Sequence, residues 1–404
     1  MGQYDAIVIG AGVAGLAAAH ALRDSSVLLL EREPRSGGRV LTVGEAQSRI
    51  DLGACFAFNV DLLPASAPAP TGRSNERGPL GLHYEGGLFF ADAPKALLEQ
   101  LPWTASDRRA LDNLRAGALS LTDAQTKLGL VLRSLFHQIH PGEIAEYCTE
   151  RQAGALYAFH PDHWAEGNGA LVAAYERALS AQVELECSVV RIEEQSGQVL
   201  VEYERAGIRS LAAARSVIVA TDAKVARSLV VPANPACAEF LSAVRYARYT
   251  VVAFRLEATA LAPDFRFVIT PQAKLSLVMQ QSPADRSWRG LLAYYADRAC
   301  EFADLLDDVA LVEHTRRELM QLGLVGLDVA NAPAQVQRWP ISGTVLTPEY
   351  QALKRASFAR ASRRVFLAGD YLAMPPGWGY GLDDAVASGR STGAHVLRAL
   401  GSEL

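Results

Sequence analysis

The sequence has little that would indicate a membrane protein, a metal site or a disulfide framework. Its 404 residues include five cysteines, with no Cys-x-x-Cys pair and no His/Cys spacing typical of zinc. We therefore expect no structural disulfides and no metal, and the cysteine usage fits a reducing compartment, the cytoplasm. The apolar runs are far shorter than the roughly 18 residues that suggest a transmembrane helix. No charged region followed by an apolar stretch precedes Tyr4, so no secretory signal is expected.

An excess of positive charge is also missing. Lys and Arg number 39 against 44 Asp and Glu, and the formal net charge is -5. Nucleic-acid-binding domains normally present clustered basic residues, so nucleic acid is not an expected partner. Hydrophobic residues make up 50% of the chain and charged residues 21%, which is typical of a globular protein with a sizeable core. The length predicts about two domains.

The N-terminal segment has the pattern of a dinucleotide-binding βαβ unit. An apolar run at residues 6–9 leads through a glycine-rich turn, 10–15, into a helix-like segment, and a second apolar run at 27–30 ends on Glu31. Glu31 follows the turn by about 20 residues, where a carboxylate can accept from both hydroxyls of a ribose. A solvated carboxylate at a strand end is the alternative interpretation of Glu31.

Each glycine of this turn has a mechanical reason. Gly10 permits a sharp turn, Gly12 leaves room for a pyrophosphate, and Gly15 allows the helix to pack closely on the strand. The N–H groups at the start of the helix then face the phosphates. A glycine-rich structural turn is the alternative.

Two further motifs indicate which dinucleotide binds. Ser36-Gly37-Gly38-Arg39 comes shortly after Glu31, and Asp51-Leu52-Gly53-Ala54 follows a short strand-like piece. With these motifs the N-terminus resembles the flavin-containing amine oxidase superfamily, which includes monoamine oxidases, protoporphyrinogen oxidase, phytoene desaturase and renalase. The resemblance implies FAD as the cofactor, with Arg39 near its pyrophosphate and Gly53 and Ala54 beside the flavin. A guanidinium suits bidentate phosphate contact, although Arg39 could also be a surface arginine.

A second signature lies near the C-terminus. Leu367-Ala368-Gly369-Asp370 precedes a helix-like segment from Asp383, and it resembles the closing motif of the same superfamily in the form nearest its desaturase branch. The resemblance implies Asp370 by the ribityl and pyrophosphate groups, and the helix N-terminus at the flavin N1/O2 edge, where it stabilises negative charge on reduced flavin. The cofactor contacts implied in all are Gly10, Gly12, Gly15, Glu31, Gly38, Arg39, Gly53, Ala54, Val189 (to the adenine side), Gly369, Asp370, Ala385 and Val386.

The predicted fold class is α/β: a Rossmann-type FAD-binding domain with a discontinuous α+β substrate domain. By the resemblance, residues 1–60, 166–225 and 336–404 form the FAD-binding domain. Residues 61–165 and 226–335 then form the substrate domain.

Hydrophobic periodicity also predicts individual elements. A hairpin is expected at residues 82–90, a helical region at 94–157, and helices at 171–179, 308–322 and 383–400. Strands are expected at 183–192, 199–203, 217–220, 249–256, 265–269, 291–295 and 365–371.

Three departures from the family pattern bear on the chemistry. An acidic Asp384 precedes Ala385, where glycine is commoner. The closing motif has no cysteine, so we expect noncovalent FAD. Tyr249 occupies the place where many amine oxidases keep a lysine. Trp378 and Tyr380 are the candidate catalytic residues, as walls over the flavin, with core packing as the alternative.

These observations predict a FAD-dependent oxidoreductase that passes a hydride from a small organic substrate, an amine or amino-acid-like compound, to flavin N5. The electron acceptor, oxygen or a quinone, is left open. One alternative is a FAD-dependent desaturase of an apolar substrate, which the closing motif favours. The other is a flavin-binding partner or maturation protein with little turnover.

Overall fold

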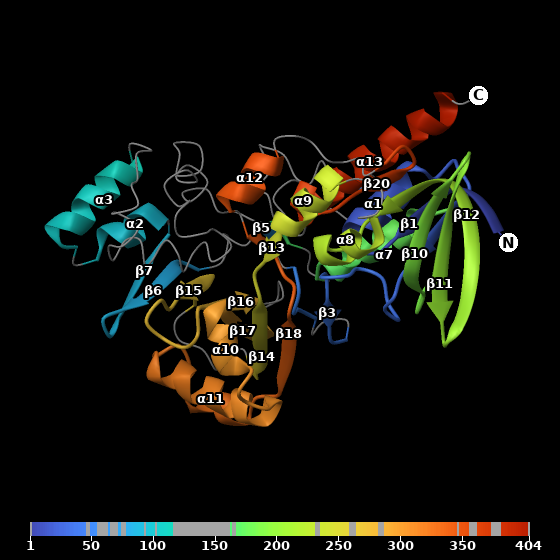
Figure 1. Ribbon diagram of the computed structural model, residues 1–404. Coiled ribbons are helices and arrows are strands. Elements are labelled where there is room, and N and C mark those ends of the chain that lie inside the picture. The colour runs from blue at the N-terminus through green and yellow to red at the C-terminus, as the bar shows by residue number, and fades with distance from the viewer. Residues whose placement is uncertain are drawn as a thin grey trace.

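Two seven-stranded sheets organise the protein. The computed structural model describes residues 2–45, 49–54, 64, 72–73, 78–92, 94–101, 103–115, 162–163, 167–230, 235–257, 264–281, 287–345, 347–354, 362–372 and 381–402. In Figure 1 the first sheet lies at the end that carries both termini, and the second lies beside it with helix α11 on its outer side. The fold is a Rossmann-type α/β domain joined to an α+β part, as predicted.

The first sheet has a parallel core and an antiparallel extension. Parallel strands run in the order β20-β12-β1-β2-β9, and the hairpin β10-β11 pairs with the first half of β12. The centre is apolar and buried, as expected for strands covered on both faces. The strands are β1 (Gly2–Ile9), β2 (Val27–Leu30), β9 (Gln182–Glu184), β10 (Ser188–Gln195), β11 (Gln198–Arg205), β12 (Ile208–Val219) and β20 (Val365–Leu367).

Helix α1 (Val13–Ala21) packs on this sheet and against the last helix, α13 (Leu382–Ser402). Glycines allow the approach: a Cβ on Gly389 would lie 2.0 Å from the carbonyl oxygen of Ala14, and one on Gly393 2.6 Å from that of Ala18. The two helix backbones therefore touch. This contact brings the start of α13 to the same edge of the sheet as the start of α1.

The second sheet runs in the order β18-β14-β17-β16-β15-β6-β7. One face packs on α10 (Arg298–Ala303) and α11 (Asp308–Gln321), and the other forms a common core with residues 50 and 52. Sequence alone did not say which face is which. The strands are β6 (Leu80–Tyr84), β7 (Gly87–Ala91), β14 (Tyr249–Glu257), β15 (Phe267–Ile269), β16 (Leu277–Gln281), β17 (Trp288–Ala296) and β18 (Ala334–Trp339).

Several predicted elements are confirmed and some are wrong in their bounds. The hairpin β6-β7 was expected, as were the helices α7 (Gly169–Ala178), α11 and α13. The segment 183–192 is not one strand: Glu186 has a φ of 60°, and the chain turns there from β9 into β10. Strand β12 begins at Ile208 rather than at Val217, because residues 206 and 207, both at positive φ, form a turn.

The last strand is also shorter than expected, since β20 ends at Leu367 and a 3₁₀ turn, η7 (Asp370–Leu372), follows. The division into domains stays a prediction; β18 spans residues 334–339 and so lies across the predicted boundary at 335/336. The predicted helical region at 94–157 begins with α2 (Pro94–Glu99) and α3 (Ala105–Arg115), and its remainder lies outside the described residues.

The remaining elements are short connections around the two sheets: β3 (Thr42–Val43), β4 (Ile50–Asp51), β5 (Gly72–Arg73), β8 (Asp162–His163), α8 (Ala223–Val230), α9 (Pro235–Ala243), β13 (Arg245–Tyr246), η6 (Leu327–Asn331), β19 (Thr344–Val345) and α12 (Pro348–Lys354). Among the described residues, no helix is long and apolar enough to cross a membrane.

Candidate cofactor and active site

At two positions of the N-terminal turn, the backbone conformation and packing of the protein require glycine, whether or not a ligand is bound. Gly10, at the carboxyl end of β1, has a φ of 98°, and a Cβ there would lie 2.8 Å from the carbonyl oxygen of Ala220. A Cβ on Gly15 would lie 1.8 Å from the carbonyl oxygen of Gly10. Close packing of α1 on the strand therefore excludes any side chain at Gly15.

Gly12 differs, because the protein supplies no steric reason for it. Its φ is -65°, and the nearest atom to a Cβ there would be the Cα of Gly38 at 4.0 Å. Gly12 is also the N-cap of α1 and gives no side-chain hydrogen bond to the first turn, whose N–H groups are left for another partner. A glycine with open space in front of an uncapped helix end fits a pyrophosphate group.

The Gly-Gly-Arg motif lies directly on this turn. The N–H of Gly37 donates to the carbonyl oxygen of Ala11 at 2.8 Å, and Gly12 and Gly37 form a parallel bridge. Gly38 has a φ of 55°, and a Cβ there would be 3.1 Å from the Cα of Gly12. The chain thus folds two separate glycine motifs into one surface.

Glu31 reaches the same turn from the end of β2. Its carboxylate is buried and accepts from the N–H of Ala11 at 2.6 Å and from that of Glu33 at 2.9 Å. Carboxylate oxygens accept more than one hydrogen bond each, so ribose hydroxyls can be bound in addition. The position agrees with the predicted role, which stays a prediction.

Val189 lies nearby on β10, next to a register shift between Val189 and Arg191. Two residues earlier, the N–H of Cys187 donates to the carbonyl oxygen of Glu31 at 2.7 Å. The segment therefore runs beside the proposed ribose site, as a backbone contact to adenine requires.

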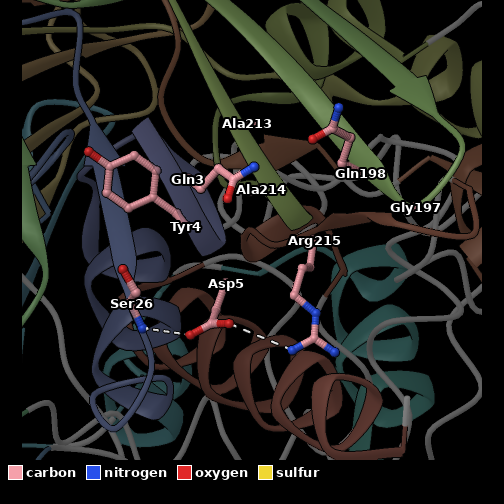
Figure 2. A pocket seen from close by; sticks show the side chains of 9 residues that line it. All are labelled: Gln3, Tyr4, Asp5, Ser26, Gly197, Gln198, Ala213, Ala214 and Arg215. Carbon is pink, nitrogen blue, oxygen red and sulfur yellow. Dashed lines mark hydrogen bonds and ion pairs between the residues drawn. The ribbon is translucent and has the colours of Figure 1, made fainter. Parts of the chain in front are cut away.

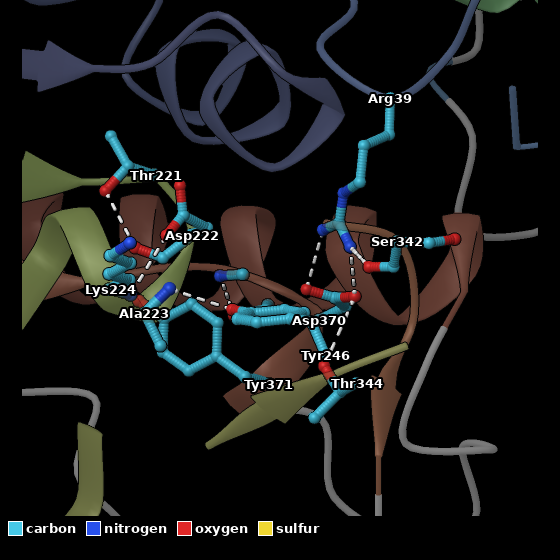
Figure 3. A network of polar contacts seen from close by, with 12 residues as sticks. Arg39, Thr221, Asp222, Ala223, Lys224, Tyr246, Ser342, Thr344, Asp370 and Tyr371 are labelled. Carbon is cyan, nitrogen blue, oxygen red and sulfur yellow. Dashed lines mark hydrogen bonds and ion pairs between the residues drawn. The ribbon is translucent and has the colours of Figure 1, made fainter. Parts of the chain in front are cut away.

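Arg39 and Asp370, predicted separately from the two ends of the chain, form one bidentate pair (Figure 3). Nη1 and Nη2 of Arg39 donate to Oδ2 and Oδ1 of Asp370 at 3.0 and 2.8 Å, and Nη1 also donates to the carbonyl oxygen of Ser342. Asp370 is 2% exposed, whereas the side chain of Arg39 is 34% exposed. Burial works against the charge on Arg39, but Asp370 outweighs it and raises the pKa of Arg39 above its ordinary value.

Residues that sequence reasoning missed complete this network (Figure 3). The ring of Tyr246 lies 5.9 Å from the guanidinium of Arg39, and its hydroxyl accepts from the N–H of Ala223 at 2.8 Å. Burial and the charge of Asp370 raise the pKa of Tyr246 above its ordinary range, so the hydroxyl stays protonated. The hydroxyl of Thr344 approaches Asp370 at 3.5 Å. No local motif marks these residues, because β13 and β19 bring them together from distant parts of the chain.

The segment 51–54, which we call the flavin-side segment, runs alongside Arg39. A Cβ on Gly53 would lie 2.0 Å from the carbonyl oxygen of Arg39, and the N–H of Ala54 donates to that oxygen at 2.9 Å. Asp51 begins the segment; its buried carboxylate accepts from the N–H of Asn168 and from the hydroxyl of Thr42. Burial raises the pKa of Asp51 to about 6, against the opposing effect of these hydrogen bonds.

Asp51 therefore gives a prediction for the pH dependence of stability. The native state binds its proton more tightly than the unfolded chain, where the pKa is about 3.8, so the free energy of unfolding falls as the pH rises through this window. Relative to Asp51→Asn, the wild type should lose about 2 kcal/mol between pH 4 and pH 7, because each pKa unit is worth about 1.4 kcal/mol and pH 4 already lies above the unfolded-state pKa. Urea unfolding of both proteins across that range measures this. Parallel curves would contradict it, and Asp328→Asn, at an exposed site, controls for the lost charge.

The second turn of α13 meets the closing motif. The N–H of Gly369 donates to the hydroxyl of Ser388 at 3.1 Å. Ala385 and Val386 are buried in the core shared with α1, and the N–H of Ala385 donates to the carbonyl oxygen of Gly381 at 3.1 Å, so their cofactor role stays a prediction. The side chain of Asp384 is buried rather than exposed to solvent.

Trp378 and Tyr380, the predicted catalytic residues, lie outside the described residues, so their role stays a prediction. His, Cys, Asp and Glu side chains of the described part form no group suited to a metal ion. Three cysteines there, Cys187, Cys237 and Cys300, are buried and are not joined in disulfides.

A surface hollow of ≈ 330 Å³ lies elsewhere, at the amino ends of the parallel strands (Figure 2). Its lining includes Asp5, which accepts from the N–H of Ser26 at 2.9 Å and lies 3.6 Å from Arg215. Ligands of open α/β sheets bind at the carboxyl ends of the strands. The hollow is therefore on the opposite edge from the nucleotide turn and is not the cofactor site.

Comparison with protein families agrees with this geometry. A family model described as flavin containing amine oxidoreductase matches residues 88–397, and one for the NAD(P)-binding Rossmann-like domain matches residues 8–61. The chain belongs to the flavin-containing amine oxidoreductase family. This member is a FAD-dependent oxidoreductase, as the sequence predicted.

Individual relatives resemble the flavoprotein in fold more than in sequence. Polyamine oxidase 3 of Oryza sativa subsp. japonica is 51% identical over 57 residues, which are 14% of this chain and 12% of that protein. Cyclohexylamine oxidase from Brevibacterium oxydans IH-35A matches with a TM-score of 0.76 and 18% identity, over 98% of this chain and 99% of the other. Putrescine oxidase bound to putrescine matches with a TM-score of 0.73 and 14% identity over the same shares. At these identities the two structures show a common fold, and they do not define the substrate.

Proposed function

We propose that this flavoprotein oxidises a small, largely apolar monoamine. The observation that carries the proposal is the contact between the flavin-side segment and one face of the second sheet, where Nε1 of Trp339 donates to the carbonyl oxygen of Leu52 at 2.7 Å. A flavin beside Gly53 and Ala54 would face that part of the sheet. In that position the flavin ring and the sheet face proposed to bind the substrate would lie next to each other.

Bound FAD would supply the redox chemistry: it would take a hydride at N5 from the carbon next to a neutral amine nitrogen, which leaves an iminium ion, and an acceptor, oxygen or a quinone, would later take the two electrons. The chain itself would hold and orient the cofactor. Gly12 and the start of α1 would bind the pyrophosphate, and Glu31 the ribose. Arg39, fixed by Asp370, presents its remaining N–H groups to phosphate oxygen.

The nature of the sheet face supports an apolar substrate. Most residues on this face near Trp339 are apolar or aromatic, namely Tyr249, Val251, Ala253, Leu277, Met279, Leu292 and Tyr294. The polar side chains of Gln281 and Gln337 lie on the same face. The rings of Tyr249 and Tyr294 meet edge to face, 6.1 Å apart. Aromatic faces attract a single ammonium group. A diamine would also need an anionic partner for its second ammonium group, so we favour a monoamine.

Anaerobic mixing tests this function. The holoprotein should lose its oxidised-flavin absorption with cyclohexylamine or benzylamine, and at least about 10-fold more slowly with putrescine, since an uncompensated second charge is costly on an apolar face. Tyr294→Ala should slow the reduction by the monoamines while FAD stays bound. An oxidised flavin after all three amines would overturn the proposal.

The apolar face also favours a second candidate, desaturation of an apolar substrate, which the form of the closing motif supports. Such an enzyme would leave its flavin oxidised with the amines and be reduced by a hydrocarbon-like substrate. Membership of an oxidoreductase family speaks against the third possibility, a flavin-binding partner with little turnover.

A further inference from the structure

Three side chains from three different elements hold the main chain of the flavin-side segment. Two of them, on β16 and β18, come from the second sheet, and the third is at the start of α7. The bonds are from Asp51 N to Gln281 Oε1 at 2.9 Å, from Trp339 Nε1 to Leu52 O at 2.7 Å, and from Asn168 Nδ2 to Ala54 O at 2.8 Å.

These bonds matter because the first half of the segment is cut off from water, while Gly53 and Ala54 are half-buried. Leu52 is 0% exposed, and the carboxylate of Asp51 is buried. If a buried carbonyl group loses its hydrogen-bond donor, its desolvation free energy is no longer offset, since no water molecule can replace the lost bond. Removing one of these side chains should therefore let the segment shift rather than leave it in place.

The orientation of the Asn168 side chain indicates that it holds the main chain at Ala54. The carbonyl oxygen of Ala54 can only accept, so the atom of Asn168 that faces it must be Nδ2. Its Oδ1 is then buried without a hydrogen-bond partner among the described residues. The side chain leaves its own oxygen unsatisfied while it holds Ala54.

Gln281 and Trp339 connect the segment to the sheet that carries the proposed substrate face. Trp339 pairs in register with Tyr249, and Gln281 pairs with Gly290 on the next strand. Nε2 of Gln281 also approaches the carbonyl oxygen of Asp51 at 3.4 Å, so this one side chain faces both main-chain groups of that residue. The second sheet thus hydrogen-bonds to the main chain of two successive residues, Asp51 and Leu52.

We propose that Gln281 and Trp339 are positioning residues for the flavin, through which the substrate sheet sets the height and tilt of the ring beside Gly53 and Ala54. The inference rests on the proposed place of the flavin next to the flavin-side segment. It does not depend on which substrate is oxidised. Substrate and cofactor would then be placed by one rigid body, as hydride transfer over a short distance requires.

The test compares matched substitutions on neighbouring residues. Gln281→Met removes the hydrogen bond at nearly constant length, and Trp339→Phe removes the N–H while keeping a ring. Gln280→Met is the control: Gln280 is adjacent on the same strand, and its Oε1 accepts from the N–H of Phe265 at 3.3 Å, away from the segment. FAD affinity is measured by titration of the apoprotein, together with the visible spectrum and midpoint potential of bound FAD.

Gln281→Met and Trp339→Phe should each weaken FAD binding about 5- to 10-fold, as loss of one buried hydrogen bond does. Each should also shift the visible spectrum and the potential. Gln280→Met should stay within about 2-fold of the wild type and leave both unchanged. Gln281 is half-buried, so its variant provides the test even if Trp339→Phe does not fold.

The proposal fails if both variants bind FAD with wild-type affinity, spectrum and potential and only lower the melting temperature, as a purely structural role would. Amine oxidation is judged separately, by reduction of the wild type. A response of FAD to these variants in a protein that no amine reduces would support the positioning role and reject the proposed function.

Discussion

Gly12→Ala should fold as well as the wild type and bind FAD at least about 100-fold more weakly. The backbone at Gly12 suits alanine, and, apart from its chain neighbours, the nearest atom of the described residues to a methyl group there would be 4.0 Å away. It would instead occupy the space through which the pyrophosphate reaches the first turn of α1. A loss of about 3 kcal/mol in binding, with an unchanged apoprotein, is the signature of a steric block on a ligand.

Gly15→Ala provides the contrast. Its Cβ would lie 1.8 Å from the carbonyl oxygen of Gly10, so α1 must move off the strand and the apoprotein should lose stability or fail to fold. Melting of both apoproteins followed by circular dichroism, and FAD titration of those that fold, separates the two glycines. A Gly12→Ala protein with wild-type FAD affinity would show that nothing approaches that surface.

Arg39→Ala should destabilise the protein by about 3 kcal/mol and also weaken FAD binding. The substitution leaves the carboxylate of Asp370, 2% exposed, without its bidentate partner, and an unpaired buried charge is costly. Asp370→Asn should cost less, because the side chain of Arg39 is 34% exposed and can be hydrated. The double variant Arg39→Ala/Asp370→Asn should recover most of the stability but not the FAD affinity.

This double-variant cycle separates folding from cofactor binding. Urea unfolding of the four apoproteins gives the coupling between the two side chains, and titration with FAD gives the binding term. Additive losses of stability would contradict the paired role. Recovery of FAD affinity in the double variant would show that Arg39 serves the fold alone.

The sequence by itself determined the nucleotide turn and the cofactor class. Gly10, Gly12, Gly15 and Glu31 lie within one βαβ unit, so their predicted roles follow from short-range spacing and from the steric needs of a turn. Periodicity also predicted the long helices α11 and α13 and most strands of the second sheet. It was wrong at residues 183–192, because a turn made by Glu186, with no glycine or proline, leaves no mark in the sequence.

Only the tertiary structure decided the contacts between distant segments. Arg39 and Asp370 are 331 residues apart, and Gln281 and Asp51 are 230 apart. Which partner a buried arginine or glutamine finds depends on how the two sheets pack, and no local pattern encodes it. The same holds for the sheet face that meets the flavin-side segment. Alternation along a strand shows that two faces exist, while the packing of α11 on one of them leaves the other for Ile50 and Leu52.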